Sequence, residues 1–205
     1  MINSISFVTD KTEFDKLLLE AGCIFNLEKR LPDQVFKEGY IFYLIKNFIG
    51  DTMSTDFWRY IQHGNLGLNN EVISFLTLDP DPVQYFHKEF SCYSAFQFPL
   101  HINDESYAQA FQNDPGHSPA DALLFNSTTV IWFPNSLNWG IWAERDLEIA
   151  ILALKKENSA LKKDRFLMDG QWMNIQAALV DILPQVFPNN VVPSDISKKL
   201  LENYI

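Results

Sequence analysis

The chain has 205 residues, of which 47% are hydrophobic and 20% are charged, so it is long enough and apolar enough to fold as one globular domain. Charged residues interrupt its apolar runs well before the roughly 20 residues that a membrane-spanning helix needs. Its N-terminal segment lacks the basic and apolar regions of a signal peptide. We therefore expect a cytoplasmic protein with no membrane segment.

The formal net charge of −10 is concentrated in the middle of the chain. Residues 54–154 contain twelve acids and three bases, whereas residues 1–53 and 155–205 are close to neutral. A negative field of this kind repels phosphate backbones and attracts basic surfaces. The charge pattern therefore disfavours nucleic-acid binding and favours a basic protein partner, with solubility as the alternative reason for the acids.

The first part of the chain predicts mainly helices. A helix capped by Thr9 or Asp10 extends to Gly22, which can end it. Residues 40–49 are so uniformly apolar that their period does not distinguish a helix from a strand, and their length and flanking glycines favour a helix. A further helix is predicted over residues 54–61.

From residue 65 onwards, β-branched and aromatic runs alternate with turn residues, which predicts strands at 72–78, 93–98, 128–133, 139–143 and 147–153. Helices are predicted between and after them, at 82–90, 103–111, 169–187 and 193–204. We therefore predict an α+β fold, a single domain over residues 1–205. Its antiparallel sheet, with a meander around residues 128–153, packs against N- and C-terminal helices.

Conventional catalytic and cofactor-binding motifs are missing, including glycine-rich phosphate loops, GxSxG and HExxH. His87, Glu89 and Cys92 form a compact group of potential metal ligands, but on a helix His87 and Glu89 would point apart. Cys23 and Cys92 are expected to be two buried thiols without a disulfide. We therefore expect no catalytic site, no cofactor and no metal.

The loop at residues 113–119 contains the best candidate for catalysis, because His117 lies beside Ser118 and near Asp121. The same residues are typical of a helix start, with Ser118 as N-cap, Pro119 at the first position and Asp121 in the first turn. We favour the helix start. An enzyme with an unfamiliar site near His117 remains an alternative.

Residues 138–151 are the most regularly patterned segment. Alternation places Trp139, Ile141 and Ala143 on one face and Gly140, Trp142 and Glu144 on the other, before a charged turn. Trp and Arg commonly anchor protein interfaces, although such a turn is also typical of a solvated corner. The predicted partner-binding residues are Trp139, Trp142, Glu144, Arg145, Asp146 and Glu148, together with Asp104, Glu105 and Asp114.

Residues 129–151, which include the string WFPNSLNWGIWAERDLEIAI, resemble the hairpin and following strand of several families of small bacterial immunity proteins. Those proteins neutralise a cognate polymorphic or contact-dependent toxin. In them a strand with a Trp-Gly pair runs through an acid-Arg-Asp turn into an apolar segment. The resemblance implies a non-enzymatic cytoplasmic protein that binds a toxin domain, and it carries over no catalytic residues. The alternative is an adaptor or regulatory module for another protein partner.

Overall fold

The computed structural model describes residues 5–47, 49–63, 71–158 and 172–205. The strands are β1 (Tyr40–Asn47), β2 (Val72–Asp79), β3 (Ala95–Pro99), β4 (Thr129–Pro134), β5 (Trp139–Glu144) and β6 (Ile149–Lys155). The α-helices are α1 (Lys11–Ile24), α2 (Thr55–His63), α3 (Lys88–Phe90), α4 (Asp104–Gln112), α5 (Leu123–Asn126), α7 (Ile175–Asp181) and α8 (Ser194–Tyr204). Shorter helical turns are η1 (Ile49–Met53), η2 (Pro82–His87), η3 (Pro119–Asp121), η4 (Lys156–Asn158), η5 (Leu183–Val186) and η6 (Pro188–Asn190).

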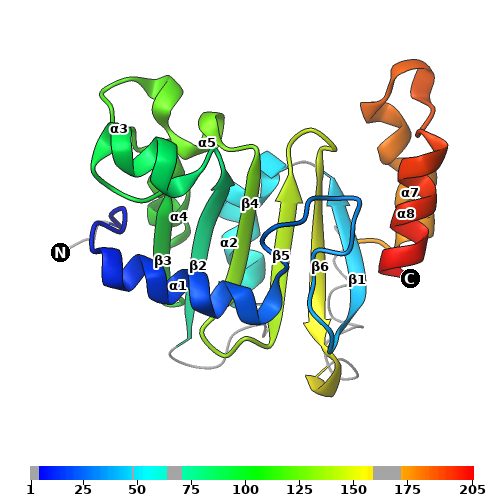
Figure 1. The fold of residues 1–205 in the computed structure, drawn as a ribbon, viewed down its shortest axis with the longest axis horizontal. Helices are drawn as coiled ribbons and strands as arrows, with labels where there is room; N and C mark the ends of the chain where they lie inside the picture. Colours follow the sequence, from blue (N-terminus) through cyan, green and yellow to red (C-terminus); the bar gives the residue numbers. More distant parts are fainter. Residues whose placement is uncertain (1–4, 48, 64–70, 159–171) are drawn as a thin grey trace.

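The described strands form one six-stranded sheet in the order β1-β6-β5-β4-β2-β3, with every neighbouring pair antiparallel (Figure 1). The predicted α+β class is confirmed, and so is the meander, which consists of β4, β5 and β6. These strands are hydrogen-bonded in chain order because short turns connect them. The predicted alternation in β5 is also confirmed, since Ile141 and Trp142 belong to the cores on opposite faces of the sheet.

Both faces of the sheet are buried. One core contains Phe75, Trp132 and Leu152, and the other contains the next residues along the same strands, which are Leu76, Phe133 and Ala153. Every described residue of β4 and β5 is buried, as is all of β6 except Lys155. Continuous apolar strands are the expected consequence of burial on two sides.

Helices cover each face. Helix α1 crosses the near face of the sheet in Figure 1, and α2 and α4 lie behind it. Helices α7 and α8 extend the near-side core beyond β1, where Ile175 and Leu200 are fully buried. Asp10 caps α1 by accepting a hydrogen bond from Glu13 N at 2.8 Å, and Asn103 caps α4 through Ser106 N at 2.7 Å, as the sequence predicts.

The two outer strands are each covered by a short backbone segment. Val8 lies along the outer side of β3, with Val8 N bonded to Ala95 O at 3.1 Å and Tyr93 N bonded to Val8 O at 2.8 Å. Met173 exchanges two backbone hydrogen bonds with Ile45 on the outer side of β1, at 2.8 and 2.9 Å. Both edges of the sheet therefore have part of their backbone paired.

The helix predicted over residues 40–49 is wrong, because residues 40–47 form strand β1. This strand pairs with β6 from Tyr40 opposite Lys155 to Asn47 opposite Ile149. An unbroken apolar run is typical of a buried helix and of a buried strand alike, so the local pattern does not distinguish the two. The pairing partner decides between them, and it lies more than 100 residues away in the chain.

Three smaller predictions also need correction. Helix α1 continues past Gly22 to Ile24, because Ala21 and Ile24 both pack into the core. The helix predicted over 169–187 is shorter, with α7 ending at Asp181 before Pro184, and its start at 169–170 lies outside the described residues. Cys23 is exposed rather than buried.

None of the described helices is both long enough and apolar enough to cross a membrane.

A substitution at Gly140 tests how closely the C-terminal end of α1 packs on the sheet. A Cβ at this position would lie 2.7 Å from Phe25 Cζ and 2.8 Å from Ile24 Cγ2. The Phe25 ring cannot easily move, because it packs against Phe36 and Trp142 at 5.4 and 5.7 Å between ring centroids. We expect Gly140→Ala to lower the free energy of unfolding by about 1–3 kcal/mol, measured by urea denaturation.

Gly22→Ala is the matched control for this prediction. Gly22 lies in α1 with open space around the added methyl group, so the same substitution should raise the free energy of unfolding by about 0.5–1 kcal/mol. Equal effects of the two substitutions would contradict the close contact at Gly140.

Candidate protein-interaction surface

The antiparallel register brings several chain segments together at one end of the sheet. Asp79 at the end of β2 pairs with Thr129 at the start of β4, and Thr129 pairs with Glu144 at the end of β5. Glu144 pairs in turn with Ile149, where β6 begins. The loops that leave these strands therefore share one rim of the molecule.

Backbone hydrogen bonds hold this rim together. Thr128 N donates to Asp79 O at 2.8 Å, and Arg145 N donates to Thr128 O at 2.8 Å. The Arg145 side chain crosses to the neighbouring loop, where Nε donates to Ser127 O at 2.6 Å and Nη2 donates to Leu124 O at 2.8 Å. The β5–β6 turn is thus fixed to the segment that contains α5.

Acidic residues are concentrated in the segments of this rim. Residues 79–90, 113–128 and 145–148 contain seven acids and two bases. Asp79, Asp81, Asp114 and Asp146 are exposed. We call the surface formed by these three segments the acidic rim; its acids are Asp79, Asp81, Glu89, Asp114, Asp121, Asp146 and Glu148, and its bases are Lys88 and Arg145.

The acidic rim also exposes large apolar side chains. Asp81 begins η2 by accepting hydrogen bonds from Val83 N and Gln84 N at 2.8 and 2.6 Å. Because η2 buries Phe86, it turns Tyr85 outward, where 39% of the residue is exposed. On α5, Leu123 is buried and Phe125 is 63% exposed. An exposed aromatic residue among acids is a suitable anchor for a protein partner.

The loop after α4, which is part of the acidic rim, packs closely against α3 and η3. A Cβ on Gly116 would lie 2.5 Å from Asp121 Oδ2 and 2.6 Å from Phe90 Cε1, so the backbone approaches both residues closely. His117 is exposed and has a positive φ of 62°. The predicted helix start is confirmed, with Ser118 at the N-cap of η3, Pro119 at its first position and Asp121 in its first turn, although the Ser118 side chain makes no capping hydrogen bond. The backbone instead closes the turn, with Asp121 N bonded to Ser118 O at 2.8 Å.

Trp139 and Trp142 cannot contact a partner directly in this structure, which corrects their prediction as binding residues. Both are 0% exposed, Trp139 in the core beneath α2 and α4 and Trp142 in the core beneath α1. The alternation in the sequence predicts that the two side chains point to opposite faces of the sheet, but it does not show that both faces are buried. Their role is to pack the sheet against its two helical layers.

Glu144 is also buried, with 6% of the residue exposed. Its carboxylate accepts hydrogen bonds from Thr129 Oγ1 at 2.7 Å and Trp142 Nε1 at 2.8 Å. Burial raises the pKa of Glu144 above its ordinary value of 4.5, and the hydrogen bonds from Trp142, Thr129 and the Leu31 backbone oppose that increase. Glu144 therefore joins β5 to the α1–β1 connection and is not a surface charge.

The other predicted residues are divided between two places. Arg145, Asp146 and Glu148 lie on the β5–β6 turn within the acidic rim, and Asp114 lies in the loop that follows α4. Asp104 and Glu105 lie at the opposite end of α4, beside the end of β3. Asp104 forms an ion pair there with Arg59 of α2, which reduces its attraction for an outside base.

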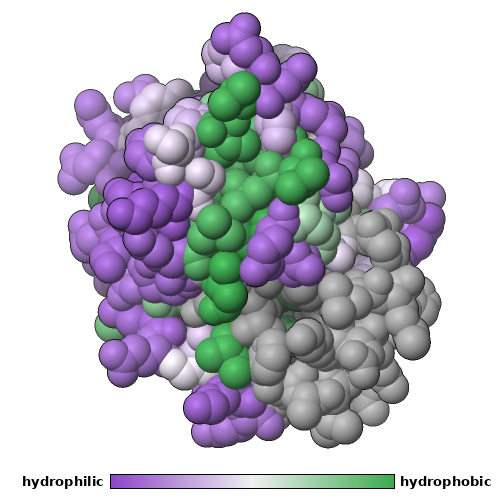
Figure 2. Space-filling view, turned by 90° about the vertical axis from the view of Figure 1, so that its right-hand side faces the viewer, coloured by the Kyte–Doolittle hydropathy of each residue, from purple (hydrophilic) through white to green (hydrophobic). Residues whose placement is uncertain are grey.

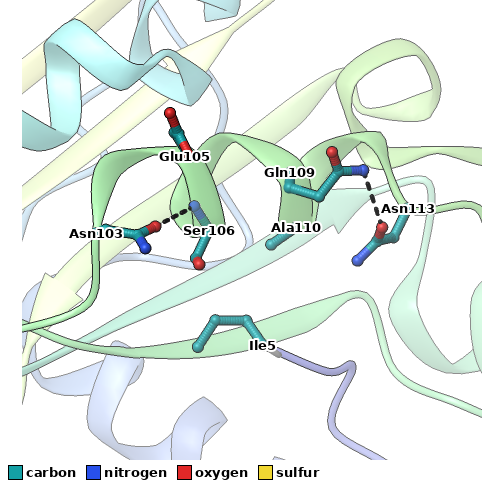
Figure 3. A pocket seen from close by; sticks show the side chains of 7 residues that line it. All are labelled: Ile5, Asn103, Glu105, Ser106, Gln109, Ala110 and Asn113. Atoms are coloured by element: carbon teal, nitrogen blue, oxygen red, sulfur yellow. Dashed lines mark hydrogen bonds between the residues drawn. The ribbon is translucent and has the colours of Figure 1, made fainter. Parts of the chain in front are cut away.

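Glu105 lines a shallow hollow of about 260 Å³ along α4 (Figure 3). The other side chains in its lining are Ile5, Asn103, Ser106, Gln109, Ala110 and Asn113. All three of these amides are already engaged, since Asn103 accepts from Ser106 N and Gln109 donates to Asn113 Oδ1 at 3.3 Å. Among the described residues that line this hollow there is no His, Lys or Cys, so they offer hydrogen bonding around a single carboxylate.

Within the described part of the chain, no group of three or more His, Cys, Asp or Glu side chains is arranged to hold a metal ion. Comparison of the chain with family models, curated proteins and solved structures gives no match. The function must therefore be inferred from the residues of the acidic rim themselves.

The raised pKa of Glu144 predicts a pH-dependent stability. The folded state retains the proton more strongly than the unfolded state, so this contribution is fully present below pH 4.5 and is lost as the pH rises through the raised pKa. We expect the unfolding free energy of the wild type to decrease relative to Glu144→Gln as the pH rises from 4.5 through the raised pKa. Urea denaturation of both proteins measures this difference, and a constant difference would contradict a buried, titrating Glu144.

Proposed function

We propose that this chain is a non-enzymatic binding protein of the immunity type, which uses the acidic rim to neutralise a basic toxin domain in the cytoplasm. The observation that supports the proposal most directly is the acid excess at the rim, whose three segments contain seven acids and two bases as well as the exposed Tyr85 and Phe125. This combination provides both long-range attraction and apolar contact area.

The acids of the rim would increase the rate of association with a basic partner. Toxins that act on nucleic acids carry basic surfaces for the phosphate backbone, and an acidic inhibitor both steers toward such a surface and covers it. The two bases at the rim offset two of its seven negative charges and leave a formal net charge of −5 (−7 + 2). Arg145 directs its guanidinium toward the carbonyl groups of Ser127 and Leu124, so the group is turned toward its own chain.

The exposed aromatic side chains would determine the dissociation rate of the complex. Interface energy is concentrated in a few residues, of which aromatic side chains are common examples. Phe125 and Tyr85 are held on short helical segments that bury their neighbours Leu123 and Phe86. Their backbones are fixed before binding, so little conformational entropy is lost when a partner covers them.

The resemblance to immunity proteins adds to this argument at the β5–β6 turn. Residues 129–151 comprise β4, β5 and the first part of β6, which are core strands, together with the turn that carries Asp146 at the rim. In this proposal the strands provide the scaffold and the turn takes part in recognition. An adaptor for a different basic protein would use the same surface, and only the identity of the partner distinguishes it.

The steering role can be tested with Asp114, Asp121 and Asp146 changed together to Asn. These acids come from two different segments of the rim, and none of them is buried. The partner for this test is a toxin domain, which the proposal expects the gene directly upstream to encode. We expect its association with the variant to slow by roughly 10- to 1000-fold at low salt, with a reduced salt dependence. Stopped-flow kinetics at two salt concentrations measures both quantities, and survival of cells that express the toxin measures protection.

The matched control changes Glu38, Glu105 and Glu157 to Gln, which removes the same charge from exposed positions at the opposite end of the sheet. Gly39 and Lys156, the neighbours of two of these acids, are joined there by a backbone hydrogen bond of 2.8 Å. If both triple variants slow association equally, net charge rather than the rim is responsible. If the rim variant leaves both the rate and protection unchanged, the proposal is wrong.

The anchoring role predicts a different kinetic effect. Phe125→Ala removes an aromatic side chain that contributes little to folding, since 63% of the residue is exposed. We expect the complex to dissociate roughly 10- to 30-fold faster with little change in association rate, because loss of an anchor acts mainly on dissociation. Leu19→Ala, at a residue that is 76% exposed on α1, is the control and should leave dissociation unchanged. Equal effects of the two substitutions would remove Phe125 from the interface.

A further inference from the structure

Apolar side chains are exposed on more than one side of the molecule, but at the acidic rim they lie among acids. Figure 2 shows apolar residues on the side where α7 and α8 lie, and charges nearly balance in that part of the chain, with three acids and two bases over residues 172–205. Phe125 instead belongs to the acidic rim, where acids outnumber bases by seven to two. The contacts that hold Phe125 in place therefore matter for recognition at the rim.

Helix α5, which carries Phe125, is too short to be stable by itself, since it has four residues. Ala122 precedes it and provides no side-chain cap. Phe125 N and Asn126 N both donate to the same carbonyl oxygen, Ala122 O, at 2.9 Å. Leu123 is buried and attaches one side of α5 to the core. The carbonyl groups at the C-terminal end of a helix have no partner within it, so they need donors from another part of the chain.

Arg145 provides these donors from the β5–β6 turn. Its Nη2 donates to Leu124 O at 2.8 Å and its Nε donates to Ser127 O at 2.6 Å, so the guanidinium spans the C-terminal end of α5. Hydrogen bonds from a cation to carbonyl oxygens are stronger than those between neutral groups. The planar guanidinium reaches both carbonyl groups at once, which an ammonium group does less well.

Arg145 also begins the turn that carries Asp146. Arg145 N donates to Thr128 O at 2.8 Å, and Arg145 O accepts from Glu148 N at 3.0 Å, which closes the turn. Asp146 is exposed within this turn. Arg145 thus connects an exposed acid of the rim to the helix that carries the exposed aromatic residue.

We propose that Arg145 is a positioning residue for recognition at the acidic rim, which acts by fixing Phe125 relative to Asp146 and does not touch the partner. This inference rests on the proposed function of the rim. It predicts an effect opposite in sign to that of charge. Removal of the Arg145 charge changes the formal charge of the rim from −5 to −6 (−7 + 1), which strengthens attraction for a basic partner. Loss of the contact with α5 should nevertheless weaken binding.

Lys88→Gln is the matched variant for Arg145→Gln. Lys88 is exposed and is the other base of the rim, so both substitutions change the formal charge equally and should affect the association rate by a similar factor. We expect Arg145→Gln alone to accelerate dissociation of the toxin-domain complex, by roughly 5- to 20-fold in stopped-flow kinetics. In a Phe125→Ala background, Arg145→Gln should accelerate dissociation no further, because its effect passes through the Phe125 side chain.

Amide hydrogen exchange of the free protein tests the contact with α5 without a partner. The amides of Phe125 and Asn126 should exchange at least about 10-fold faster in Arg145→Gln than in the wild type, and at the wild-type rate in Lys88→Gln. The loosening should stay local, because the Ser127 and Thr77 hydroxyl oxygens lie 3.2 Å apart within hydrogen-bonding distance. Arg145→Lys keeps the charge but loses the fork of donors, and it should change both rates less and in the same direction.

Unchanged amide exchange in Arg145→Gln would overturn this inference whatever the partner does. Dissociation as slow as that of the wild type, or additive effects of Arg145→Gln and Phe125→Ala, would also overturn it. Failure of the proposed function gives a different pattern, in which Phe125→Ala and the rim acid variant leave both binding rates unchanged while amide exchange is faster in Arg145→Gln. That pattern overturns the role of Arg145 in recognition and leaves its contact with α5 intact.

Discussion

The structure depends on one constraint, which is that the central sheet is buried on both faces. Trp132 and Leu152 require cover on one side, and Phe133 and Trp142 require it on the other. Helix α1 with the C-terminal helices, and α2 with α4, provide that cover, so neither sheet face is available for a partner. A partner could reach only the ends of the strands, where the acidic rim lies, and the outer sides of the helices.

The sequence predicts much of this architecture because turn residues and β-branched runs are local signals. The β4–β6 meander, the caps at Asp10 and Asn103 and the final helix are confirmed. Residues 40–47 are mistaken for a helix because their nearly unbroken apolar run has no period-2 pattern. The pairing of β1 with β6 determines its structure, and a long-range partner leaves no mark on the local pattern.

The candidate site is harder to predict, since a count of acids says nothing about where they lie. The excess over residues 54–154 is visible in the sequence, but Glu144 is buried and Asp104 is paired with Arg59. Antiparallel pairing brings the other acids to one rim, although Asp79 and Asp146 are 67 residues apart in the chain. The sequence does not predict that Phe125 is exposed, because its neighbours Leu123 and Leu124 are also apolar.

The segments that cover the outer strands have a consequence for aggregation. A strand as apolar as β6 is prone to add to another chain when its backbone is open, and a sheet edge is where such addition starts. Here β6 lies inside the sheet, and Val8 and Met173 occupy part of the hydrogen-bonding positions beside β3 and β1. Loss of either segment would open an edge for growth into fibres. The segments around Val8 and Met173 thus protect the sheet edges of a chain whose interior strands are mostly apolar.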